Sequence, residues 1–267
     1  MRAGVGGMLG RLAQILGLNA VPVAGFFGQG WSPGTALAIY WVESLLVIGF
    51  VSTRVALHRR WTRKAGHFRT PTFTQQKAGV ARPLGSGSLL ASYLTVAIPF
   101  TLAHGFFLGM LLFLFLPQAF GATAAVSLGD LGKGVVGVLA FLVVGLAMDL
   151  VSLRERSYRW VELVTQRAMG RIFVVHMTII FGVGAAAFFH APTAIFGLFA
   201  GLKTLFDLGG ALPQRELALE PPRWLAFLDR FKGQDGESFS AYWRRTEEAE
   251  RAIRAENEEV YRGAGRH

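Results

Sequence analysis

Six ionisable side chains lie inside segments of this chain that are otherwise apolar: Glu43, His104, Asp149, His176, Lys203 and Asp207. A charged group is costly in hydrocarbon, so each of them needs a partner or a function. Two imidazoles and a carboxylate are a common ligand set for zinc, with a fourth position left for water. Glu43, His104 and His176 are therefore candidate ligands of a divalent transition metal.

A metal at this site would supply hydrolytic chemistry, because water bound to such an ion becomes a nucleophile near neutral pH. The leading hypothesis is hydrolysis within the membrane, with Glu43 as ligand or general base and with Lys203 and Asp207 as catalytic groups that contact substrate. Two histidines on separate helices could instead hold a haem iron from both sides. The chain has no His-Glu-x-x-His motif or other local metal signature, so the residue types leave both cofactors open.

The segments that carry these residues are long enough to cross a bilayer, which requires about 20 apolar residues in a helix. Of the 267 residues, 52% are hydrophobic and 16% are charged, and there is no cysteine. This composition excludes a disulfide framework, an iron–sulfur cluster and a thiol nucleophile. The sequence predicts an all-α integral membrane protein with a bundle of six spans, at about 9–28, 34–57, 89–116, 131–153, 168–189 and 192–212. Pro99 should kink or tilt the third span.

Four of the ionisable groups fall at a similar depth, roughly 13–20 Å below the outer ends of their spans. They are Glu43, His104, His176 and Lys203. Shared depth predicts one convergent site, but it also fits simple neutralisation, with Lys203 paired to Glu43 or to Asp207 one turn away. A third hypothesis is a small permease or proton-coupled carrier in which these groups titrate during transport. Asp149 is expected to pair with Arg171 near the cytoplasmic end of the bundle.

The net charge of +10 is unevenly distributed, and this distribution predicts the topology. The segment between the second and third spans holds seven basic residues: Arg59, Arg60, Arg63, Lys64, Arg69, Lys77 and Arg82. Four more lie between the fourth and fifth spans: Arg154, Arg156, Arg159 and Arg167. The other three connections contain no Lys or Arg, so the positive-inside rule places both basic loops and both termini in the cytoplasm.

Residues 1–211 are thus predicted to form the transmembrane domain, and 212–267 a cytoplasmic tail. The tail should contain a short amphipathic helix at 224–228 and a charged helix within 239–262. The solvated tail helix could dock a partner, which leaves a non-catalytic scaffold as a further hypothesis. The basic loop at 59–82 should attract anionic lipid head groups, and nucleic acid is not an expected partner. Solvated or interfacial positions are predicted for His58, His67 and His190.

Four short motifs in the spans resemble a domain-of-unknown-function family of multi-pass bacterial membrane proteins. They are Tyr40-Trp41-Val42-Glu43, His104-Gly105-Phe106-Phe107, the run from Met169 to His176, and the run from Leu202 to Asp207. The resemblance covers about residues 12–211. It implies a compact helical domain in a bacterial inner membrane, in which these polar residues matter, and it supplies no activity.

Overall fold

The computed structural model describes residues 5–69, 87–115, 125–189, 192–211, 220–230 and 236–262. Its α-helices are α1 (Val5–Gly28), α2 (Pro33–Thr62), α3 (Gly66–Arg69), α5 (Leu89–Met110), α7 (Leu128–Ser152), α8 (Tyr158–Phe189), α9 (Pro192–Ala211) and α10 (Phe239–Glu258). A π-helical turn, Leu111–Phe115, continues α5, and 3₁₀ segments occupy Leu153–Glu155 and Arg223–Arg230. Within these ranges, strand-like pairing is limited to one antiparallel bridge between Lys64 and Val260.

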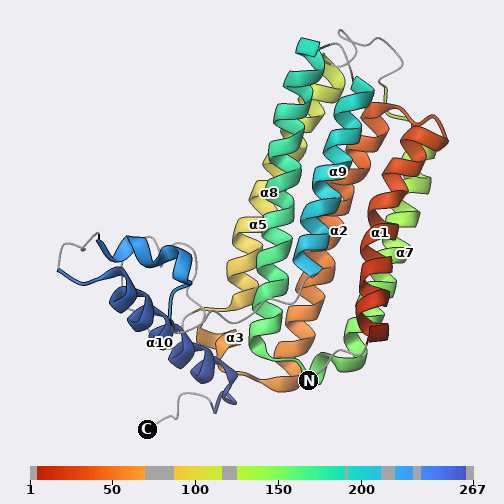
Figure 1. The fold of residues 1–267 in the computed structure, drawn as a ribbon. Coiled ribbons are helices and arrows are strands. Elements are labelled where there is room, and N and C mark those ends of the chain that lie inside the picture. Colours follow the sequence, from red (N-terminus) through yellow and green to blue (C-terminus); the bar gives the residue numbers. More distant parts are fainter. Residues whose placement is uncertain are drawn as a thin grey trace.

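The helices α1, α2, α5, α7, α8 and α9 run side by side as one bundle (Figure 1). Helix α2 is at its centre and contacts α1, α5, α7 and α8, while α9 packs against α1 and α8. Large apolar side chains such as Phe106, Phe113 and Val151 are exposed on the outer faces. In the described part of the chain, four helices are long and apolar enough to cross a membrane: Gly7–Gly28, Pro33–Thr62, Leu89–Leu114 and Leu128–Glu155. The all-α class is confirmed.

Local sequence signals explain where several helices begin. Ser32 caps α2 by accepting a hydrogen bond from the backbone N–H of Thr35 at 3.0 Å, and Pro33 occupies the first turn, where its missing N–H costs nothing. Ser127 caps α7 in the same way. Pro99 lies inside α5, as the sequence predicts, and the helix continues past it to Met110.

Helix α8 extends beyond the predicted fifth span, because it begins at Tyr158 instead of near residue 168. Ser157 starts this extension by accepting a hydrogen bond from the N–H of Trp160 at 3.1 Å. Arg159 and Glu162, three residues apart, form an ion pair at 2.6 Å on its surface. Part of the predicted basic loop at 154–167 is therefore helical.

The C-terminal tail is packed against the rest of the protein, since its helix α10 contacts α3 and α8. Glu258 at its end accepts hydrogen bonds from Lys64 Nζ at 2.5 Å and from the backbone N–H of Arg159 at 3.1 Å. Burial raises the pKa of Glu258, but these hydrogen bonds outweigh it and hold the pKa below its usual range. Tyr261 donates its backbone N–H to the Arg63 carbonyl at 2.8 Å. Residues 239–258 of the predicted tail are helical, and the C-terminal end of this helix is docked on the C-terminal end of α2 and the N-terminal end of α8.

His58 and His67 are fully buried at this junction, so the prediction that they are solvated or interfacial is wrong. His58 Nε2 lies 3.0 Å from the Arg156 carbonyl and must donate to it, so the neutral ring accepts at Nδ1 from His67 Nε2, 2.7 Å away. The His67 ring also meets the Tyr158 ring edge-on. Burial, followed by His58 and by the nearby cations Arg59 and Lys64, lowers the pKa of His67 to about 3.

A buried neutral His67 makes stability depend on pH. Below pH 6.5, the ordinary pKa of a histidine, His67 is protonated in the unfolded chain but stays neutral in the folded protein. The free energy of unfolding must therefore fall as pH falls. Between pH 6.5 and 5, His67 should account for a loss of about 1.6 kcal/mol. Thermal unfolding measured across this range should show a smaller loss for His67→Gln than for the wild-type protein. Equal losses in the two proteins would show that His67 is not held neutral.

Candidate functional site

A buried polar cluster lies around the side chain of Lys203. Its ammonium lies 2.7 Å from Asn19 Oδ1 and 3.2 Å from both Glu43 Oε1 and Asp207 Oδ2. Asn19 also donates to Asp207 Oδ2 at 2.9 Å. Helices α1, α2 and α9 are therefore linked through one hydrogen-bonded network. The expectation that Lys203 pairs with Glu43 or Asp207 is met by both carboxylates.

Arg171 of α8 completes this cluster. Its guanidinium contacts Glu43 Oε1 and lies 3.3 Å from Asp207 Oδ2. The cluster thus contains two cations and two carboxylates, and the side chains of Lys203 and Glu43 are each only 1% exposed. Lys203 also lies 5.1 Å from the centroid of the Tyr40 ring, which adds a cation–π contact. Formal neutrality is what makes such burial tolerable.

A second cluster is centred on Asp149, near the end of α7, and includes Arg11, near the start of α1. Asp149 accepts from Arg11 of α1 at 2.8 Å and from Arg54 of α2 at 2.7 Å. The predicted pair of Asp149 with Arg171 is wrong, because Arg171 is turned toward Glu43 and Asp207. One carboxylate faces two guanidinium groups here, so this cluster carries a formal excess of one positive charge.

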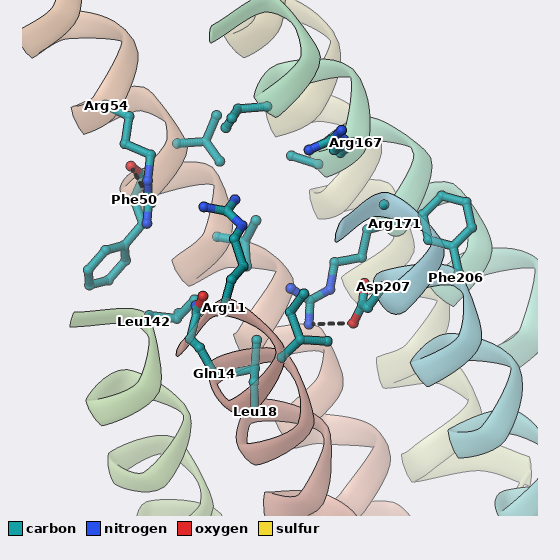
Figure 2. A pocket seen from close by; sticks show the side chains of 16 residues that line it. Arg11, Gln14, Leu18, Phe50, Arg54, Leu142, Arg167, Arg171, Phe206 and Asp207 are labelled. Atoms are coloured by element: carbon teal, nitrogen blue, oxygen red, sulfur yellow. Dashed lines mark hydrogen bonds and ion pairs between the residues drawn. The ribbon is translucent and has the colours of Figure 1, made fainter. Parts of the chain in front are cut away.

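Between the two clusters lies a cavity of about 140 Å³. Figure 2 shows Arg11, Arg54, Arg167 and Arg171 around it, with Asp207 joined to Arg171. No carboxylate of the described residues lies within ion-pair distance of Arg167, and its Nε is buried without a hydrogen-bond partner. With Lys203 and the two clusters included, five cations surround this region against three carboxylates. The region around the cavity therefore carries a formal excess of two positive charges among the described residues.

The structure describes the side chains of two of the three predicted metal ligands. Glu43 is buried on α2 and His104 is buried on α5, whereas the side chain of His176 lies outside the described residues. Within the described part of the chain, no group of three or more His, Cys, Asp or Glu side chains could hold a metal ion. Glu43 Oε1 is already occupied by Lys203 and Arg171, and Oε2 has no hydrogen-bond partner. A zinc-like ion at Glu43, His104 and His176, or a haem held by the two histidines, stays a prediction.

Sequence reasoning missed the arginines as members of the site. Arg54 lies inside the predicted second span and Arg171 inside the predicted fifth. A charged side chain is energetically costly inside a membrane span, and this cost could have identified both arginines as candidate site residues. Asn19 gave a weaker signal, as one of two side-chain amides, with Gln14, within the first span. These three side chains come from segments far apart in the sequence, and the packing of α2 against α1 and α8, and of α9 against the same two helices, brings them together.

The comparisons with known proteins give one match. A model of a family of unknown function, DUF6498, matches residues 10–223. The chain belongs to the DUF6498 family. The matched region contains both charged clusters and all of the bundle except the first residues of α1, in agreement with the family resemblance of the sequence motifs. No curated protein and no solved structure matches this member of DUF6498.

The paired cluster predicts a rescue experiment. Lys203→Met should destabilise the protein by about 3–5 kcal/mol, because it leaves two buried carboxylates sharing Arg171. Combining Lys203→Met with Glu43→Gln should recover most of that loss, because the buried cluster is again formally neutral. Thermal unfolding in detergent measures both effects.

The matched control is Lys133→Met, because Lys133 pairs with Asp130 at 2.8 Å on an exposed part of α7. Loss of this surface pair should cost less than about 1 kcal/mol. If the double variant loses as much stability as Lys203→Met and Glu43→Gln lose together, Glu43 and Lys203 are not energetically coupled.

Proposed function

We propose that this protein is an integral membrane carrier for a small anion, which binds in the arginine-lined cavity. The observation that carries the proposal is the excess of cations around that cavity, and above all Arg167, for which the described residues supply no carboxylate. Arg167 is half-buried, and a partly desolvated cation without a counter-charge is costly, so a bound anion would be stabilised by offsetting that cost.

The chemistry and size of the cavity narrow the class of ligand. A guanidinium group presents a planar set of N–H donors that matches the oxygens of carboxylates and phosphates. A volume of about 140 Å³ is close to the roughly 150 Å³ of an engineered cavity that binds benzene. Inorganic phosphate, sulfate and short carboxylates fit both criteria.

A carrier explains why the two clusters lie beside the cavity. An anion bound there would compete with Asp149 and Asp207 for Arg54, Arg11 and Arg171, and so would bias the ion pairs that join the helices. Glu43, Lys203 and Asp207 would then act as coupling groups instead of catalytic ones. Ionisable residues inside a membrane bundle commonly mark such pathways.

The membrane topology belongs to the same proposal. We place α8 and α9 in the bilayer with the four long apolar helices, which gives six spans with both termini in the cytoplasm of a bacterial inner membrane. Support comes from the basic residues between α2 and α5 and between α7 and α8, and from the absence of Lys and Arg in the connections at the other end.

Anion binding is tested most sharply at Arg167. Binding of phosphate, sulfate and acetate to the purified protein should be measurable by calorimetry, and Arg167→Gln should weaken the preferred anion at least tenfold, because it removes the uncompensated charge. Arg159→Gln is the matched control on the same helix, since Arg159 is paired with Glu162 away from the cavity. The control should keep wild-type affinity, and proteoliposomes of the wild-type protein should take up the same labelled anion.

Two results would contradict the carrier. One is the absence of binding by all three anions. The other is an unchanged affinity in Arg167→Gln, which would place any bound anion elsewhere.

The topology has its own test. Reporter fusions after Pro83, after Arg156 and at the C-terminus should report the cytoplasm, because each follows a basic segment. Fusions near Gly121 and His190 should report the opposite side. A cytoplasmic signal at Gly121 would overturn the six-span arrangement.

A further inference from the structure

A second basic site lies outside the bundle, at the end of α2. A surface hollow of about 400 Å³ is lined by three arginines from one stretch of the chain and by apolar side chains from α2, α3 and α5. The lining residues are Ala56, Arg59, Arg60, Arg63, Phe68 and Leu90. This hollow is separate from the cavity that contains Arg167, with which it shares no residue.

The three arginines are not neutralised by the parts of the chain that the structure describes. Arg59 lies over the Phe68 ring at 4.6 Å, and Phe68 is itself stacked on Tyr261 of the docked tail. Arg60 and Arg63 are exposed, and no ion pair to a carboxylate joins any of the three among the described residues. The hollow therefore presents concentrated positive charge, and the Phe68 contact gives Arg59 a defined position.

The depth of the hollow matches the head-group region of a bilayer. Helix α2 has 30 residues and is about 45 Å long, which equals the thickness of a bilayer with its head groups. Its last turn, which holds Arg59 and Arg60, therefore lies among the head groups if α2 spans the membrane. Leu90, at the start of α5, and Ala56, one turn deeper on α2, form the apolar wall on the hydrocarbon side.

We infer that this hollow binds the phosphate of an anionic phospholipid, with its acyl chains along Ala56 and Leu90. Arginine guanidinium groups bind phosphate through several N–H donors at once, and basic pockets at the cytoplasmic ends of helices bind lipid head groups. The apolar wall favours a lipid over free phosphate, because free phosphate has nothing to place against it. This site requires α2 to span the membrane, but it does not require the cavity to bind an anion.

The test measures lipid binding by the full-length protein in detergent. Native mass spectrometry with phosphatidylglycerol and with phosphatidylcholine should show a clear preference for the anionic lipid. The variant Arg60→Gln/Arg63→Gln should bind phosphatidylglycerol about thirtyfold more weakly, at roughly fivefold for each cation near the membrane surface. Arg244→Gln, an exposed arginine on α10, is the control and should bind it as the wild-type protein does.

Further measurements separate this site from its alternatives. Inorganic phosphate at millimolar concentration should not displace the lipid, and displacement would show that the hollow is a site for free anions. Arg167→Gln should bind phosphatidylglycerol normally, which keeps this result independent of the carrier proposal. An unchanged affinity in Arg60→Gln/Arg63→Gln, or equal binding of the two lipids, would overturn the inference.

Discussion

Buried charge in an apolar bundle must be matched, and this constraint governs the arrangement of the helices. Arg171 lies between Glu43 and Asp207, and Lys203 faces the same two carboxylates. Removing one member would leave an uncompensated charge where water cannot easily reach it. With Asn19 of α1 included, the cluster joins α1, α2, α8 and α9. Electrostatic interactions as well as packing therefore fix these four helices relative to one another.

The same constraint explains the position of α2. This helix carries Glu43 toward one cluster and Arg54 toward the other, three turns apart, and it packs against α1, α5, α7 and α8. Lipid-like packing of apolar side chains gives little directional preference in a membrane, because the lipid tails are as apolar as leucine. Polar links from one central helix to its neighbours supply the missing specificity. The cavity lies between these links, so a ligand there acts on the contacts that hold the bundle together.

Much of the fold could be predicted from the sequence, because long apolar runs leave few alternatives to a helix. The pairing of Lys203 with Asp207 was also predictable, since four residues on a helix place both side chains on one face. The partners of Arg171 and Asp149 were not, because depth along a span says nothing about which helices are neighbours. The burial of His58 and His67 was missed for a related reason. It depends on the packing of the tail against α3, and the tail lies about 190 residues later in the sequence. The metal hypothesis rested on residue types and on shared depth, and His176 lies among the side chains that the structure leaves undescribed.

The energetic coupling between Glu43 and Arg171 tests the matched-charge constraint most directly. A double-mutant cycle with Glu43→Gln, Arg171→Gln and the combined variant, followed by thermal unfolding in lipid nanodiscs, isolates this pair from its neighbours. Each single variant should destabilise the protein. The loss of unfolding free energy in the combined variant should be smaller than the sum of the two single losses by more than about 1 kcal/mol. Strictly additive losses would contradict a structure organised around this ion pair.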